Sequence, residues 1–93
     1  MTNNRYKSVW DATGEESATA ENLKIRAALM RRLVDDITAK AMTQSEAAKR
    51  LGVTQPRISD LTRGKVDLFS IDSLVDMLLA AGLHVDIRVR EAG

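Results

Sequence analysis

The segment from Thr43 to Gly64, TQSEAAKRLGVTQPRISDLTRG, constrains the fold more tightly than any other part of the sequence. Thr43 and Glu46 have the spacing of a capping box, in which each side chain accepts a hydrogen bond from the other residue's backbone N–H. A short helix is predicted to follow, with apolar side chains on one face and an end at Gly52, where a positive φ would let the chain turn. That apolar face contains Ala47, Ala48 and Leu51.

A second short helix is predicted directly after this turn. Val53 fills the turn, Thr54 occupies the N-cap position, and Gly64 ends the helix. Ile58 and Leu61 are spaced to hold the second helix against the first. Two short helices joined by a glycine turn in this way are typical of a helix-turn-helix.

The outward side of the second helix carries the chemistry of DNA recognition. The amide of Gln55 can pair with adenine, Arg57 can contact a guanine edge or a phosphate, and Arg63 suits a phosphate. Asp60 would accept from cytosine N4 or, the alternative we favour, orient Arg57 and Arg63. The full predicted DNA-binding set is Gln44, Thr54, Gln55, Pro56, Arg57, Ser59, Asp60, Arg63 and Lys65.

Charge is distributed unevenly although the net charge is only +1. Between Thr43 and Lys65 the basic side chains exceed the acidic ones by three, whereas from Val66 onward the acidic side chains exceed the basic ones by three. A local basic excess on the motif is what a phosphate footprint requires. The excess is small, so the motif itself is the stronger indication.

A long amphipathic helix is predicted before the motif, at about Ala18 to Ala41, after an N-terminal arm of residues 1–16 in which Trp10 is the anchor. One apolar stripe of this helix should cover the helix-turn-helix. A second stripe broadens the apolar face, and two partners for it stay open, the N-terminal arm and a partner chain. The first stripe is Leu23, Ala27, Met30, Val34, Ile37 and Ala41, and the second is Ile25, Leu29 and Leu33. Residues 17–82 are therefore expected to form the DNA-binding domain.

A last helix, from Ile71 to Ala81, is predicted after the motif, capped by Ser70 and stapled by Phe69 against Leu74. Its predicted buried face is Ile71, Leu74, Val75, Leu78 and Leu79. Residues 83–90 then alternate apolar and polar side chains, which predicts a half-buried strand. Because no second strand is predicted, the strand should pair with another copy across a homodimer, through Leu83, Val85, Ile87 and Val89.

Several classes of function find no support in the sequence. There is no cysteine, and the single histidine, His84, lies on the polar face of the predicted strand. Asp35 and Asp36 are adjacent on a helix and so point in different directions, which argues against a catalytic carboxylate pair. We therefore expect no enzyme activity, no metal and no cofactor. The chain has no membrane-length apolar run or signal-peptide core, and a cytoplasmic location is expected.

The motif, with Gln44 and Gln55 opening its two helices, resembles the lambda-repressor (XRE) superfamily. From about Ser8 to Val89 the chain is similar to its small HigA-type antitoxins and related repressors, through runs such as SVWDA, AENLKIRAALM and GLHVDIRV. The resemblance implies an all-α, lambda-repressor-like domain of about four main helices, with a C-terminal strand pairing across the dimer. It also implies that Gln44 bonds a phosphate and braces Gln55.

The function implied is a sequence-specific transcriptional repressor of double-stranded DNA, acting as the antitoxin of a type II toxin–antitoxin pair that controls its own operon. The toxin partner rests on the resemblance alone. Two alternatives stay open, a stand-alone XRE-type regulator without a toxin and a protein-interaction module that does not bind DNA. A neighbouring toxin gene would separate the first alternative, and salt-dependent promoter binding would separate the second.

Overall fold

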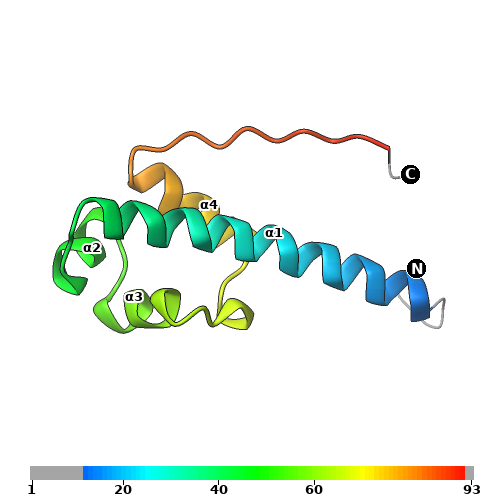
Figure 1. Cartoon of the computed structure of the whole chain (residues 1–93), viewed down its shortest axis with the longest axis horizontal. Coiled ribbons are helices and arrows are strands. Elements are labelled where there is room, and N and C mark those ends of the chain that lie inside the picture. The colour runs from blue at the N-terminus through cyan, green and yellow to red at the C-terminus, as the bar shows by residue number, and fades with distance from the viewer. Residues whose placement is uncertain (1–11, 92–93) are drawn as a thin grey trace.

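The computed structural model describes residues 12–91, which form four α-helices, a short 3-10 turn and an extended C-terminal segment (Figure 1). The helices are α1 (Ala12–Ala39), α2 (Gln44–Leu51), α3 (Gln55–Thr62) and α4 (Ile71–Ala80), and the 3-10 turn η1 is Val66–Leu68. Helices α2 and α3 form the predicted helix-turn-helix, and α1 and α4 pack against each other beside it. The predicted all-α fold is therefore confirmed for the described residues.

Helix α1 begins earlier and ends earlier than the sequence pattern predicts. It starts at Ala12 rather than Ala18 and runs through Gly14 and Ser17, where the predicted arm gives way to the predicted helix. A single glycine among good helix formers costs only about 1 kcal/mol, which is too little to end a helix. At the other end Ala41 takes a positive φ of 50°, and the Met42 N–H donates to the Ile37 carbonyl at 3.1 Å. The predicted Trp10 anchor lies outside the described residues.

The core lies under the C-terminal half of α1 only. Met30 and Ile37 of the first predicted stripe are buried, and so is Leu33 of the second stripe. The two stripes thus merge into one buried face near this end. Leu23 and Ile25 remain 36% and 43% exposed, because the N-terminal half of α1 projects beyond the other helices (Figure 1). The first stripe therefore covers the helix-turn-helix only through its C-terminal part, and Ile25 of the second stripe has no cover among the described residues.

Helix α4 confirms the predicted cap and corrects the predicted face. Ser70 accepts a hydrogen bond from the Ser73 N–H, and Phe69 and Leu74 are 1% and 0% exposed, as a hydrophobic staple requires. Met77 is buried and Leu79 is 52% exposed, contrary to the prediction. The buried positions Leu74, Met77, Leu78 and Ala81 follow the helical steps of three and four, from which Leu79 departs.

Residues 83–91 leave α4 at Gly82, which has a φ of 85°, and run as an extended segment beside α1 (Figure 1). No strand is assigned among the described residues, because a strand is defined by hydrogen bonds to a neighbouring strand and this segment makes none with residues 12–91. Leu83 and Val85 are half-buried, but Ile87 and Val89 are 77% and 92% exposed. The predicted strand is not observed in one chain, and its pairing across a dimer stays a prediction.

Candidate nucleic-acid interface

The first helix of the motif forms as its sequence predicts. The Thr43 N–H donates to Glu46 Oε1 at 2.9 Å, and the Glu46 N–H donates to Thr43 Oγ1 at 3.1 Å. Gly52 takes a left-handed conformation with a φ of 72° and ends α2. This turn presents the N-terminus of α3 at a defined angle to α2.

Helix α3 is fixed to the body by its two buried side chains, Ile58 and Leu61, which are 0% and 1% exposed. Thr54 has extended backbone angles at the N-cap, but its hydroxyl makes no capping hydrogen bond. Pro56 lies in the first turn, where a missing N–H costs nothing. The hydroxyl of Thr54 is therefore available to an outside acceptor such as a phosphate oxygen.

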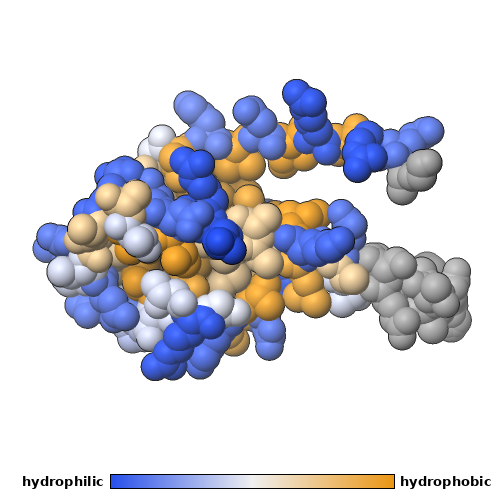
Figure 2. Space-filling view, in the orientation of Figure 1, coloured by the Kyte–Doolittle hydropathy of each residue, from blue (hydrophilic) through white to orange (hydrophobic). Residues whose placement is uncertain are grey.

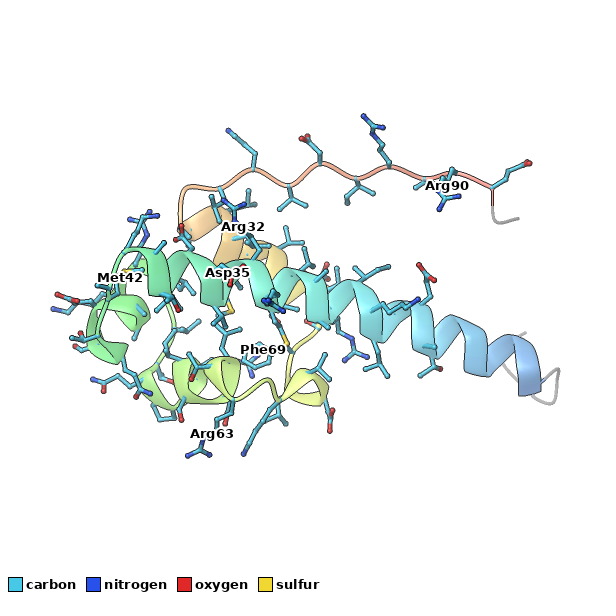
Figure 3. The ribbon with its side chains drawn as sticks, in the orientation of Figure 1. Arg32, Asp35, Met42, Arg63, Phe69 and Arg90 are labelled. Carbon is cyan, nitrogen blue, oxygen red and sulfur yellow. The ribbon has the colours of Figure 1, made fainter. Side chains whose placement is uncertain are left out.

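The predicted DNA-binding residues gather on one side of the molecule, around α3. Six of them are exposed, namely Gln44, Thr54, Gln55, Pro56, Arg63 and Lys65, and the other three, Arg57, Ser59 and Asp60, are half-buried. In Figure 1, α3 and the C-terminal segment lie on opposite sides of α1, and Figure 3 shows Arg63 directed away from the body. The outward face of α3 is thus open to a ligand as large as a duplex.

Arg57 is held by the protein itself rather than directed outward alone. Its Nη1 donates to the Leu68 carbonyl at 2.7 Å, and its guanidinium carbon lies 4.0 Å from the centroid of the Phe69 ring. A guanidinium over an aromatic face is attracted by the negative potential of the ring. Arg57 therefore joins the start of α3 to η1, a contact that the sequence analysis did not predict.

Two other predicted contacts among these side chains are not formed within residues 12–91. Asp60 pairs with Lys65 at 3.9 Å, and it makes no ion pair with Arg57 or Arg63. Gln44 and Gln55 share no hydrogen bond in this part of the chain, so the predicted bracing is not observed in the free protein. An expectation that Asp60 orients the two arginines does not describe the unbound chain.

Arg50, which was counted in the basic excess of the motif, points to the interior side. Its Nη2 donates to the Ala81 carbonyl at 2.7 Å, and its Nε lies 4.0 Å from Oδ2 of the buried Asp36. Arg50 and Arg57 are thus engaged within the chain and Lys65 pairs with Asp60, which leaves Lys49 and Arg63 as the cations of the motif without an ion pair or hydrogen bond among residues 12–91. The phosphate footprint is consequently narrower than the sequence count indicates.

The loop after α3 depends on a residue that the sequence did not single out. Arg26 of α1 donates to the carbonyls of Val66 and Phe69 at 3.3 and 3.2 Å. The same loop therefore receives arginine donors from α1 and, through Arg57, from α3. No local signal could have revealed this pairing, since Arg26 and Val66 are forty positions apart.

Other kinds of site find no geometric support in the described part of the chain. Within residues 12–91, no three histidine, cysteine or acidic side chains are grouped so that they could hold a metal ion. None of the helices described combines the length and the apolar character needed to cross a bilayer. The outward face of α3 is accordingly the candidate site developed below.

Comparison with known proteins identifies a family and a similar solved structure. The family model described as "Helix-turn-helix domain" matches residues 12–90. A solved structure described as "Putative XRE Family Transcriptional Regulator" is similar in fold, with a TM-score of 0.74 and 32% sequence identity, over 80% of this chain and 83% of that one. No curated protein matched the chain.

Proposed function

Because the chain belongs to the helix-turn-helix domain family, we propose that it is a transcription regulator that binds double-stranded DNA in a sequence-specific manner. Helix α3 would enter the major groove with its N-terminal end toward the base edges, as in other proteins with this motif. Gln55 would read adenine, Thr54 and Gln44 would bond phosphates beside it, and Arg63 and Lys65 would contact phosphates near the other end.

One observation supports this proposal most directly, the exposed polar face of α3 over a fully buried apolar face. A helix in a protein core would need apolar residues at Gln55, Pro56 and Arg63, all of which are exposed here. The outward face also lies away from the C-terminal segment (Figure 1), so a partner at that segment would leave α3 accessible. A protein-interaction module remains the second candidate class, and it predicts binding without the salt dependence of phosphate contacts.

The test uses the promoter region of the gene itself as the DNA probe. Replacing a side chain that reads a base should cost about 1–3 kcal/mol in specific binding, which we expect for Gln55→Ala. Arg63→Ala should instead weaken binding to all sequences alike and lower the salt slope by about one. Lys24→Ala, which removes an exposed cation from α1, is the matched control. Unchanged promoter affinity in folded Gln55→Ala and Arg63→Ala would refute the interface.

We further propose that the protein acts as a homodimeric repressor. Two major-groove half-sites on one side of a duplex lie about 34 Å apart, and a two-fold dimer matches a palindromic operator. The unpaired extended segment, with Leu83, Val85, Ile87 and Val89 alternating along it, is the proposed dimer element. Repression follows if the operator overlaps the promoter, which transcription from that promoter with and without the protein would test.

An antitoxin role is a separate prediction that rests on the sequence resemblance alone. It requires a toxin encoded beside this gene and a stable complex with it. Co-expression with the neighbouring gene, followed by purification of one partner, would test it. A regulator whose neighbouring gene encodes no growth inhibitor would instead be the stand-alone alternative.

A further inference from the structure

The C-terminal segment has backbone groups that are not hydrogen-bonded to another strand, and its polar and apolar side chains lie on opposite faces. Figure 2 shows its hydrophilic side chains gathered on the outer side and its hydrophobic ones on the side toward α1, with open space between the segment and the distal part of α1. Ile87 and Val89 of the segment are exposed apolar side chains, and so are Leu23 and Ile25 of α1. Backbone groups without partners and apolar side chains without cover both indicate a missing second strand.

We propose that this strand is the same segment of a second copy, running antiparallel, with the two-fold axis passing between the two Ile87 residues. The proposal rests on the homodimer proposed above and adds its register. In this register Asp86 lies opposite Arg88 of the other copy on the polar face, twice by symmetry. On the apolar face Ile87 lies opposite itself, and Val85 lies opposite Val89. Position 87 is the midpoint of residues 83–91, one residue more than the predicted strand, and the outermost pair of this ladder places Leu83 opposite Glu91 at its end.

Charge excludes the neighbouring registers that keep the apolar residues on one face. An axis at Asp86 places the two Asp86 carboxylates opposite each other, and an axis at Arg88 does the same with two guanidinium groups. Like charges directly opposite each other destabilise a strand pair, whereas opposite charges stabilise it. An axis at Val85 brings His84 opposite Asp86 but shortens the ladder to about half. A parallel, in-register pair would place every charged residue beside its own copy.

Registers with the axis between two residues are excluded by the faces. Directly opposite residues of an antiparallel pair point to the same face, and a shift by one residue turns each polar side chain to the apolar side. Only registers centred on a residue therefore keep one face apolar, and among them the one at Ile87 combines full overlap with opposite charges at Asp86 and Arg88. This register also places His84 opposite Arg90, a pair that adds no attraction. The electrostatic preference for the register therefore comes from the two pairs of Asp86 with Arg88.

The register has a geometric consequence for DNA binding. The apolar face of the segment is turned toward α1, and α3 lies on the opposite side of α1 from the segment (Figures 1 and 2). A two-fold axis perpendicular to the paired strands therefore runs in the direction from the segment to α3. Rotation about that axis leaves both copies of α3 on the same side of the dimer. This is the arrangement that two half-sites on one face of a duplex require.

Disulfide cross-linking tests the register directly, because the chain has no cysteine and an introduced one is the sole thiol. In an antiparallel pair the Cα atoms of opposite residues are about 4.5–5.5 Å apart, within the range of a disulfide, while diagonal neighbours are about 7–8 Å apart and fall outside it. Under mild oxidation of the full chain without DNA, Ile87→Cys should cross-link about tenfold faster than Asp86→Cys or Arg88→Cys. A faster rate at either of those two positions, or equal rates at all three, would overturn the register.

A charge exchange provides a second measurement that leaves the apolar face intact. Asp86→Arg should raise the dimer dissociation constant about tenfold by sedimentation, because two attractive pairs become repulsive. Asp86→Arg combined with Arg88→Asp should restore it. Asp76→Arg, on an exposed site of α4, makes the same change in net charge and should leave it unchanged. Dimers that survive all three variants, or a monomeric parent, overturn the proposal. Promoter binding by such a protein would leave the DNA-binding function standing, whereas loss of promoter binding in the parent would refute that function separately.

Discussion

Arg57→Met is the substitution that best separates a side chain that reads bases from one that positions the helix that reads them. Methionine keeps the apolar stem of arginine and removes the guanidinium. The variant therefore loses the 2.7 Å hydrogen bond to the Leu68 carbonyl and the contact with the Phe69 ring, while the packing of the stem stays close to that of the parent.

The expected loss of stability follows from these two contacts. A hydrogen bond from a charged donor contributes about 1.5–3 kcal/mol, and the lower end applies because this bond is exposed. A guanidinium over a ring contributes about 0.5–2 kcal/mol, depending on how far it is desolvated. Part of this loss of stability is offset, because the ordered Arg57 side chain no longer has to give up conformational entropy on folding. We expect a net loss of about 1–2 kcal/mol, which lowers the Tm by about 4–8 °C per kcal/mol in a chain of this size.

Thermal unfolding and promoter binding are measured together, with Arg63→Met as the matched control. Arg63 is exposed and its side chain has no ion pair or hydrogen bond among the residues that the structure describes, so its replacement should change stability by less than about 0.5 kcal/mol. If Arg57 positions α3, Arg57→Met lowers affinity for all operator variants by one factor, and the loss shrinks when Phe69→Leu is already present. An unchanged Tm, with affinity lost only for operators carrying one particular guanine, would refute this reasoning and restore the predicted base contact.

Substitutions at three further positions, with matched controls at two of them, test the caps and turns. At Gly52 an added Cβ meets nothing within 4 Å, so the cost is backbone strain alone: Gly52→Val should destabilise by about 1–3 kcal/mol in chemical denaturation and Gly52→Asn by clearly less. Ala41→Gly should stabilise by about 0.5–1 kcal/mol, because Ala41 has a φ of 50°, and a Tm below that of the parent would contradict this. Thr43→Ala removes one half of the capping box and should destabilise the protein by about 0.5–2 kcal/mol. Ser45→Ala, at the second residue of α2 and outside the capping box, should not produce this loss.

The parts of the fold that the sequence predicts well are those controlled by neighbours in the chain. Thr43 with Glu46, Gly52 and Gly64 at the helix ends, and Phe69 with Leu74 are all local patterns, and each forms as predicted. The start of α1 was missed because Gly14 imposes only a weak penalty on a helix. Local rules are sufficient where one residue acts on the next turn.

The site shows where such rules end. The positions of α3 that face outward follow from Ile58 and Leu61, but the direction of a long side chain does not follow from its position. Arg57 could reach either DNA or η1, and Arg50 either solvent or α4, and the partners of both come from distant parts of the chain. The predicted strand is not formed in one chain for a related reason, since in the proposed dimer its hydrogen-bond partner belongs to a second molecule.

The bond from Arg50 to the Ala81 carbonyl secures the end of α4 against α2, and the next residue, Gly82, is where the segment departs with a φ of 85°. In the proposed dimer, the helical body before Gly82 therefore determines which bases are read. The segment after Gly82 determines the distance between the two half-sites. The two properties can change independently during evolution. A relative with a lengthened or redirected C-terminal segment would bind the same half-site at a new operator spacing, with no substitution in the helical body.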